Sequence, residues 1–261
     1  MFLCNLKRQK RMGMNRLIKS IAAIMLMMFF VVGCTKPDEP NNGGNEGEND
    51  SIADNGSTLN GHEFVDLGLP SGTLWATCNI GAEAPEDYGD YFAWGETAPK
   101  EIYDWKSYRY GRFFNERYEL NKYCTNPDFG FNGFVDSLTV LEPADDVALA
   151  QWGAGWRIPT IGEWDEMFQN TTSVWTTQNG VNGWRFTAEN GNSLFLPAAG
   201  YWWESAFNGA DLGVYWSVTL NKEFPYRAWG FHFNSSQCHL CGSSDRNRGQ
   251  TVRAVVGRDD L

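Results

Sequence analysis

Basic residues are scarce in this sequence. The chain has 21 lysines and arginines against 32 aspartates and glutamates, which gives a formal net charge of −11 at pH 7. Six of the basic residues lie within residues 1–33, so the remainder of the chain is more acidic still. An excess of negative charge repels phosphate backbones, and we therefore expect no nucleic acid among the partners of this protein.

Motifs of common hydrolases are also absent. The sequence contains neither a G-x-S-x-G nucleophile motif nor an H-E-x-x-H zinc motif. Carboxylates are plentiful, but no motif places two of them together. We therefore predict that the protein is not an enzyme, with no catalytic residues and no cofactor.

No apolar segment of the sequence reaches the length of roughly 20 residues that a membrane-spanning helix needs. The apolar stretch from Ile21 to Gly33 has only 13, and it follows a basic segment, residues 1–20, that holds no acidic residue. A basic region, a short apolar region and a small residue at the boundary predict a secretory signal peptide over residues 1–33. Met14 opens a complete signal by itself, so the first 13 residues could be a start-site artefact.

Cys34 follows the apolar stretch directly. Residues 31–34 (V-V-G-C) resemble a bacterial lipobox, whose cysteine is diacylated and becomes the mature N-terminus. The resemblance implies a lipoprotein anchored in the outer membrane through Cys34. An uncleaved signal anchor is the alternative.

Residues 34–61 are expected to form a disordered acidic tether. They are rich in asparagine and glycine and have almost no apolar side chain, so they cannot bury enough surface to offset chain entropy. A coil of this length would reach on the order of 30 Å. Lys36, Asp38 and Glu39 resemble the export signal that sends Bacteroidetes lipoproteins to the outer face of the outer membrane, which implies a location at the cell surface. An ordinary acidic linker is the alternative.

Residues 62–261 are expected to form one globular domain of the α+β class. Two helices are predicted, one from Pro143 to Trp152 and one from Ile161 to Gln169, where Thr160 and Glu163 form a capping box. Elsewhere short strands alternate with turns and long loops. The predicted strands are Glu63–Leu67, Gly183–Thr187, Ser193–Leu196, Gly213–Ser217, Ala228–Phe233 and Gln250–Val255.

Several motifs in this domain are together similar to those of the Fibrobacter succinogenes major paralogous domain family. They occupy residues 62–82, 88–97, 152–164, 191–201, 214–218 and 248–255. The resemblance implies a C-type-lectin-like fold, related to that of the formylglycine-generating enzyme, in which the N- and C-terminal strands pair. Residues 63–67 and 251–255 are then expected to be neighbours. Within such a scaffold Trp152, Trp156 and Trp164 are predicted to be core residues.

The C-terminal part of the domain is the predicted ligand-binding region. In residues 227–234 the alternation places Phe231 and Phe233 on a core face, and residues 235–247 read as an irregular polar loop. In relatives diversified by retroelements, the corresponding region carries a variable binding face. On that analogy the candidate contacts are Tyr226, Trp229, His232, Asn234, Ser236, His239, Asp245 and Asn247. An ordinary solvated loop is the alternative.

Four cysteines remain after the lipidation site. In an exported protein they are candidates for disulfides, with Cys78–Cys124 as one plausible pair and Cys238–Cys241 as a local one. A zinc site would need four ligands, and the single C-x-x-C supplies two, so we predict no metal. The predicted domain, residues 62–261, also contains none of the E-P-N, Q-P-D and W-N-D tripeptides of calcium-dependent lectins.

The sequence therefore indicates a cell-surface lipoprotein with a domain that binds a glycan or a protein. Two alternatives stay open. One is an oxidase similar to the formylglycine-generating enzyme, which would use Cys238 and Cys241; the other is a structural or adhesive subunit of a surface assembly. Fold alone does not assign function, so the choice rests on the resemblance and on the missing catalytic motifs.

Overall fold

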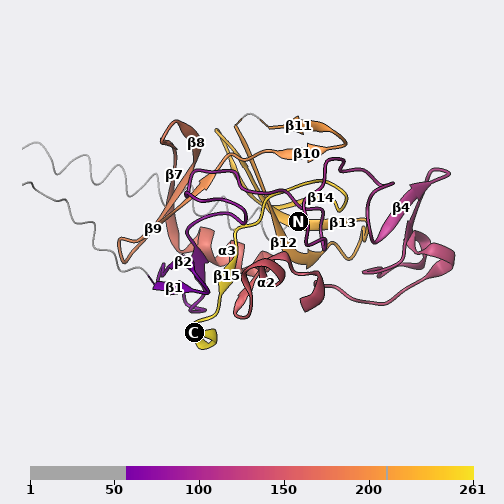
Figure 1. Ribbon diagram of the computed structural model, residues 1–261, viewed down its shortest axis with the longest axis horizontal. Coiled ribbons are helices and arrows are strands. Elements are labelled where there is room, and N and C mark those ends of the chain that lie inside the picture. The colour runs from indigo at the N-terminus through magenta and orange to yellow at the C-terminus, as the bar shows by residue number, and fades with distance from the viewer. Residues whose placement is uncertain (1–56, 210) are drawn as a thin grey trace, which may run out of the picture. The chain divides into compact units, whose positions relative to one another are not determined.

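The computed structural model describes residues 57–209 and 211–261, and only the backbone of residues 239–241 (Figure 1). The described residues fall within one compact unit of the chain, Ala53–Leu261. The predicted signal peptide, the lipidation site Cys34 and most of the predicted tether lie outside the described residues. No helix in the described part of the chain is long and apolar enough to cross a membrane.

The described unit is α+β and rich in antiparallel strands. Its largest sheet has five strands in the order β1-β2-β3-β15-β6. These are β1 Ser57–Leu59, β2 His62–Val65, β3 Leu74–Ala76, β15 Val255–Val256 and β6 Trp156–Arg157.

The domain begins five residues earlier than predicted. Residues 57–61 were assigned to the tether, but β1 pairs with β2 through a two-residue turn at Asn60 and Gly61, both with positive φ. An Asn-Gly turn between two short strands is a strong local hairpin signal, because both residues tolerate this backbone conformation. The Asn60 side chain then donates hydrogen bonds to the carbonyls of Trp152 and Ala154, at 2.9 and 3.0 Å, which ties the hairpin to the domain.

The expected direct pairing of the two end strands is wrong. β3 lies between β2 and β15, and its central residue Trp75 is paired with Val65 on one side and with Val255 on the other. The chain turns back after β2 at Gly72, whose amide donates to the carbonyl of Leu69. This nearby return supplies the neighbour of β2, so the C-terminal strand joins the same sheet one position further on.

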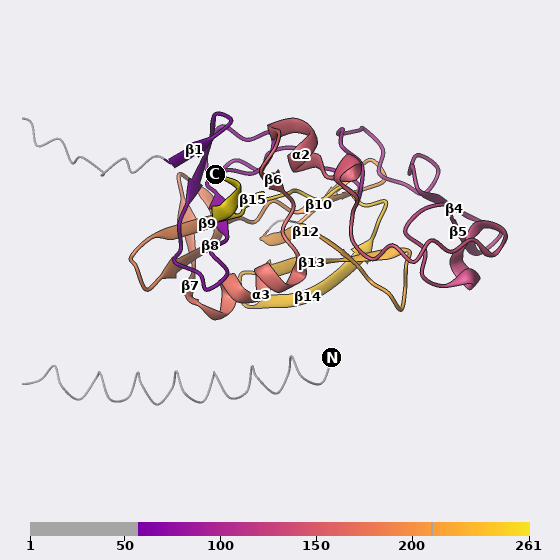
Figure 2. The ribbon, with the colours of Figure 1, turned by 90° about the horizontal axis from the view of Figure 1, so that it is seen from below.

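Two further sheets have three strands each, and two hairpins stand beside them (Figures 1 and 2). Every neighbouring pair of strands is antiparallel. The first sheet holds β7 Thr171–Gln178, β8 Val181–Ala188 and β9 Ser193–Pro197; the second holds β12 Leu212–Leu220, β13 Arg227–Asn234 and β14 Cys238–Asp245; the hairpins are β4 Gly111–Phe114 with β5 Arg117–Leu120, and β10 Tyr201–Trp203 with β11 Ala206–Asn208.

The helix α3, Ile161–Gln169, has the predicted bounds and cap. The Thr160 hydroxyl accepts a hydrogen bond from the Glu163 amide at 3.1 Å, and the Glu163 carboxylate accepts one from the Thr160 amide at 2.8 Å. Glu163 also binds the Arg157 guanidinium in a two-point contact. Glu163 is thus the carboxylate partner of Arg157.

The other predicted helix is shorter than expected. Pro143–Asp145 forms a 3-10 turn, η3, and α2 spans only Val147–Trp152. Asp146 separates them because its backbone is extended and its carboxylate accepts hydrogen bonds from the amides of Ala148 and Leu149, at 2.9 and 3.3 Å. An aspartate cap of this kind competes with continuation of the helix through the same residue. The remaining 3-10 turns are η1 Pro127–Phe129, η2 Phe131–Gly133 and η4 Arg258–Asp260.

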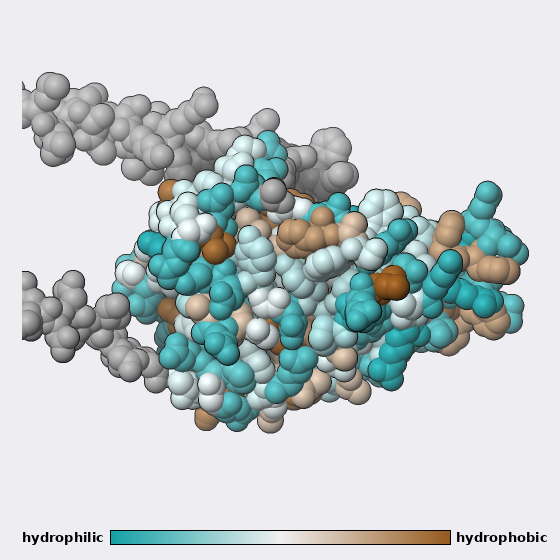
Figure 3. All heavy atoms as spheres, turned by 45° about the horizontal axis from the view of Figure 1, so that its top comes forward, coloured by the Kyte–Doolittle hydropathy of each residue, from teal (hydrophilic) through white to brown (hydrophobic). Residues whose placement is uncertain are grey.

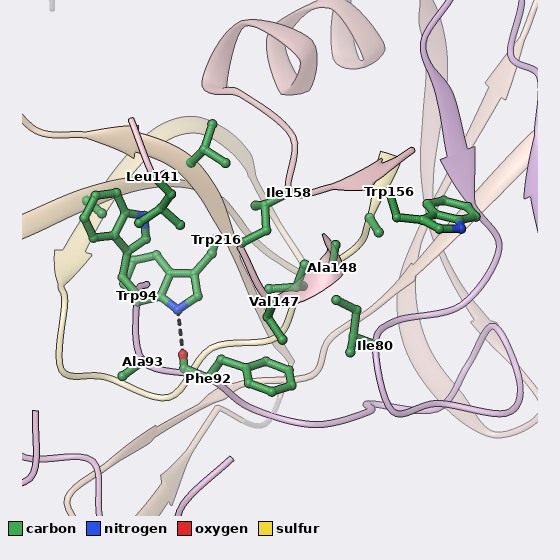
Figure 4. Close-up of a cluster of buried hydrophobic side chains, with 14 of the residues drawn as sticks. Ile80, Phe92, Ala93, Trp94, Leu141, Val147, Ala148, Trp156, Ile158 and Trp216 are labelled. Atoms are coloured by element: carbon green, nitrogen blue, oxygen red, sulfur yellow. Dashed lines mark hydrogen bonds between the residues drawn. The ribbon is translucent and has the colours of Figure 1, made fainter. Parts of the chain in front are cut away.

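Two hydrophobic clusters cover opposite faces of the sheet formed by β12, β13 and β14. On β12, Trp216 belongs to one cluster and Tyr215 to the other, as the alternation of strand side chains requires. Figure 4 shows the first cluster, in which the Trp216 indole donates to the carbonyl of Phe92 at 2.7 Å. The predicted core tryptophans are confirmed: Trp152, Trp156 and Trp164 are all buried.

Asp145 is a buried carboxylate that should make the fold sensitive to acid. It accepts hydrogen bonds from Tyr110 at 2.5 Å, from Lys122 at 2.6 Å and from Tyr123. Burial alone would raise its pKa, but these three donors outweigh burial and hold the pKa below its usual value. A carboxylate with a lowered pKa stabilises the folded state above its unfolded pKa of about 3.9, and this stabilisation is lost as the pH falls through the folded value.

We therefore expect Asp145→Asn to lower the free energy of unfolding by about 1–3 kcal/mol at pH 7, because the buried donors lose a charged acceptor. The difference between the wild type and the variant should shrink as the pH falls from about 5 towards 2. Urea denaturation at several pH values measures both quantities. A difference that stays constant over this range would contradict the assignment of acid sensitivity to Asp145.

Candidate functional site

The region predicted to bind the ligand is mostly a strand. Residues 235–247 were expected to form an irregular loop, but Cys238–Asp245 forms β14 along β13. Only residues 235–237 make the turn, where the Asn234 side chain accepts hydrogen bonds from the amides of Ser236 and Gln237, both at 2.9 Å. Serine, glycine and aspartate have low strand propensity, and the pairing partner overrides it.

The eight predicted contact residues do not share one surface. Along β13, Trp229 lies on the same face as Phe231 and Phe233, which are buried in the core as predicted. His232 and Asn234 lie on the opposite face, because side chains alternate along a strand. The backbone of His239 pairs with that of His232, and its side chain lies outside the described atoms.

The residues at the far end of the sheet have other roles. Asp245 pairs with Arg227, its carboxylate lying 3.0 Å from Nε, and Tyr226 stacks on Tyr118 with ring centroids 3.9 Å apart. Asn247 is 2% exposed and its amide nitrogen donates to the carbonyl of Tyr103 at 3.1 Å, so its prediction as a surface contact is wrong. Burial under the segment around Tyr103 is a tertiary contact that the local sequence did not indicate.

A hollow of about 210 Å³ lies elsewhere, beside β10. None of its residues was predicted as a contact. We call it the β10 hollow; its lining residues are Asp90, Tyr91, Pro99, Lys100, Glu101, Tyr103 and Trp202.

Backbone pairing brings three distant segments together at the β10 hollow. Tyr103 and Glu204 exchange two backbone hydrogen bonds, at 2.9 and 3.0 Å, and Trp202 pairs with Gly249 in the same way. Gly249 is required there, because a Cβ atom would lie 2.8 Å from the Tyr103 ring. The two pairings attach β10 and the adjoining Glu204 to the other two segments and so fix the shape of the hollow.

The walls of the β10 hollow are aromatic. Tyr91 meets Trp202 edge to face, with ring centroids 6.3 Å apart, and Trp202 packs on Phe207 at 5.5 Å. The Tyr91 hydroxyl donates to the carbonyl of Ala199, and the Tyr103 hydroxyl to that of Tyr91, both at 2.5 Å. Burial raises the pKa of both tyrosines, so both hydroxyls stay protonated at neutral pH and keep these bonds.

The rim of the β10 hollow is polar and acidic. The Lys100 ammonium pairs with Glu96 at 2.8 Å and lies 5.7 Å from the centre of the Tyr103 ring. Asp90 and Glu101 take part in none of the ion pairs between described residues. The site thus offers an aromatic wall beside two carboxylates that can accept hydrogen bonds from a ligand.

The opposite face of the same hairpin is also aromatic. Tyr201 and Trp203 alternate with Trp202 along β10, so they point away from the hollow. Trp203 is 50% exposed, and the Arg248 guanidinium carbon lies 5.4 Å from its ring and 5.2 Å from the ring of Tyr201. We call this group of three residues the Arg248 surface.

One sequence signal could have found this hairpin. Three consecutive aromatic residues, Tyr201 to Trp203, cannot all face the core of one strand, because alternate side chains point to opposite faces. Rings on both faces of a strand are buried only where another layer covers each face, and no layer of described residues covers Trp203, which is 50% exposed. The sequence analysis assigned no role to Trp202 or Trp203, so the exposed Trp203 was not predicted.

The predicted Cys78–Cys124 disulfide is not formed. Cys124 is buried and its thiol donates to the carbonyl of Asn126 at 3.1 Å, while the Cys78 sulfur lies 3.7 Å from the Thr77 hydroxyl. Burial raises the pKa of both thiols. The side chain of Cys241 is not described, so the proposed bridge to Cys238 lies outside the described atoms. No group of three potential metal ligands comes together among the residues that the structure describes.

Comparison of the chain with protein-family models, with curated proteins and with solved structures found no match.

Proposed function

We propose that this protein is a surface lipoprotein whose domain binds a glycan in the β10 hollow. The observation that carries the proposal is the aromatic wall of Tyr91 and Trp202 beside the carboxylates of Asp90 and Glu101. A sugar ring has an apolar face that packs on an aromatic ring, and its hydroxyl groups need acceptors around the edge. A concave site with a few convergent polar groups is the usual form of a small-ligand site.

The proposed fold is a finer statement than the α+β class. We propose a C-type-lectin-like domain, on the strength of the family resemblance of residues 62–255. The membership of β2 and β15 in one sheet is compatible with that fold, although the two strands are not neighbours. The hollow replaces the predicted face of β13 and β14 as the proposed contact region.

The proposed location rests on the sequence. We propose that Cys34 is lipidated and holds the chain in the outer membrane, with the domain at the cell surface beyond an acidic linker. The signal pattern of residues 1–33 supports export, and the acidic residues after Cys34 support an outer location. The acidic net charge argues against nucleic acid as a partner.

A second candidate function has one observation in its favour. Phe113, Phe114 and Phe131 are each about half exposed around β4, and the Arg112 guanidinium lies over the last two rings at 5.2 and 5.6 Å. Brown and tan side chains stand among teal ones at this end of the molecule (Figure 3). Exposed aromatic groups also suit a subunit of a surface assembly. Sedimentation at increasing concentration separates a monomeric binder from such a subunit.

Trp202→Ala tests the proposed function. We expect the variant to bind at least about tenfold more weakly to any neutral glycan that the full-length chain retains on a glycan array, because it loses the stacking surface. Asp90→Asn, which leaves the aromatic wall in place, should also weaken binding by removing a charged acceptor. Isothermal titration in detergent micelles gives the affinities, and circular dichroism checks the fold.

Phe114→Ala is the matched control for this test. It removes an exposed aromatic ring of β4 that takes no part in the β10 hollow. Its affinity should stay within about twofold of the wild type, since surface changes away from a site have small effects. Equal losses in the control and in Trp202→Ala would count against the hollow as the binding site.

A further inference from the structure

Arg248 occupies an unusual place beside the proposed glycan site. It follows β14, and its amide donates to the carbonyl of Asp245 at 3.1 Å, which fixes the turn. Its guanidinium then lies between the rings of Tyr201 and Trp203, with the central carbon 5.2 and 5.4 Å from the two centroids. The backbone turn and the two rings hold the charged group in a defined position at the edge of the hairpin.

The guanidinium of Arg248 has no acidic partner among the described residues. It takes part in none of their ion pairs, and its Nε is buried without a hydrogen-bond acceptor. Nearby Arg227 has Asp245 at 3.0 Å, and Arg157 has Glu163. In a chain with 32 acidic and 21 basic residues, an arginine held in place but left without a carboxylate retains its capacity to bind one.

We infer that the Arg248 surface is a second binding subsite, which takes the carboxylate of an acidic sugar; this inference rests on the proposed glycan-binding function. The planar guanidinium matches the two oxygens of a carboxylate, and its terminal nitrogens can donate to both. Trp203 is half exposed beside it and provides an apolar face for the sugar ring. A uronic acid and a sialic acid both offer this combination of ring and carboxylate.

The two faces of the hairpin differ in charge and so select different residues of a glycan. The β10 hollow presents Asp90 and Glu101, which repel a carboxylate, whereas the Arg248 surface presents a cation. Alternation along β10 separates Trp202 from Trp203. An acidic sugar is thus directed to Arg248, and a neutral one fits the hollow.

The experiment compares acidic glycans with neutral counterparts. Trigalacturonate and its methyl ester are titrated into the full-length chain in detergent micelles, with sialyllactose and lactose as a second pair. We expect the wild type to prefer the acid of at least one pair by about tenfold, and Arg248→Gln to abolish that preference. Affinity for the neutral ligand should change by less than about twofold.

Two further variants separate a specific contact from a general effect of charge. Arg248→Lys keeps the charge but loses the planar fork, so it should recover only part of the preference. Arg227→Gln removes a cation that is already paired with Asp245 and should leave the preference intact. Circular dichroism of each variant checks that the domain is folded.

The failure of this inference can be told apart from the failure of the proposed function. If neutral glycans bind through Trp202 but Arg248→Gln changes no acidic preference, the inference is overturned and the proposed function stands. If no glycan of either charge binds on an array, both are overturned. If an acidic peptide binds through Arg248 as tightly as the acidic sugars, the assignment to sugars is overturned.

Discussion

Replacing Arg246 with methionine should lower the free energy of unfolding by about 3–5 kcal/mol. Arg246 is fully buried and forms no ion pair with a carboxylate of the described residues. It donates instead to the Tyr108 hydroxyl at 2.8 Å and to backbone carbonyls at 2.8–3.0 Å; these belong to Lys122, Tyr123 and Pro225.

The large expected effect comes from the acceptors that the substitution would leave behind. A methionine fills part of the volume but donates no hydrogen bond, so three carbonyls in the protein interior lose a charged donor. A buried acceptor without a partner loses its hydration and gains nothing in exchange, at about 1–3 kcal/mol each and with incomplete additivity. Urea denaturation followed by tryptophan fluorescence measures the loss.

Arg248→Met is the matched control for Arg246→Met. It is the same substitution two residues further along, at a half-buried arginine that makes no ion pair with another described residue. Its effect on stability should stay within about 0.5–1 kcal/mol. If Arg246→Met were no more destabilising than this control, the buried arginine would not be a structural element of the fold.

Trp164→Ala should destabilise the domain by a similar amount, about 3–5 kcal/mol. Trp164 is fully buried on α3 and stacks on Phe231 with ring centroids 4.8 Å apart and planes 2° apart. It also packs on Trp75 at 4.6 Å and donates to the carbonyl of Trp216 at 3.3 Å. Truncation removes these contacts between α3 and the sheet that holds β12 and β13. It leaves a cavity that the surrounding close-packed core fills only in part.

Trp203→Ala separates the effect of burial from the effect of losing a tryptophan. Trp203 is 50% exposed on β10, so its truncation should change the free energy of unfolding by less than about 1 kcal/mol. Trp164→Phe retains an aromatic ring against Phe231 and should be less destabilising than the alanine variant. Similar losses in Trp164→Ala and Trp203→Ala would show that the core assignment of Trp164 is wrong.

The proposed binding surfaces are independent of these two core positions. The β10 hollow and the Arg248 surface lie against opposite faces of the same hairpin, and the pairings of Trp202 with Gly249 and of Tyr103 with Glu204 hold that hairpin on the domain. A ligand that carries both neutral and acidic sugars could contact both of its faces. Variants at Trp202 and Arg248 should therefore alter affinity while leaving most of the stability in place.

Local sequence determined several elements correctly. The capping box of Thr160 and Glu163 gave the bounds of α3, and alternating apolar residues located most of β8, β9, β12 and β13. The same alternation placed Phe231 and Phe233 in the core. The Asn60-Gly61 turn is equally local, but the predicted start of the domain lies just after it, whereas β1 begins at Ser57. Each of these features depends on residues that are close together in the sequence, because backbone preference and the alternation of side chains are local properties.

Only the tertiary structure decided the rest. The polar segment Cys238–Asp245 becomes β14 because β13 offers its edge, β3 intervenes between β2 and β15, and Asn247 is buried beneath Tyr103. The β10 hollow likewise joins residues 90–103 to Trp202, and no local pattern encodes that meeting. Secondary-structure propensity and hydrophobic periodicity describe a residue and its neighbours along the chain. Strand order, burial and the shape of a binding surface depend instead on which distant segments supply hydrogen-bond partners and which segments pack over a residue.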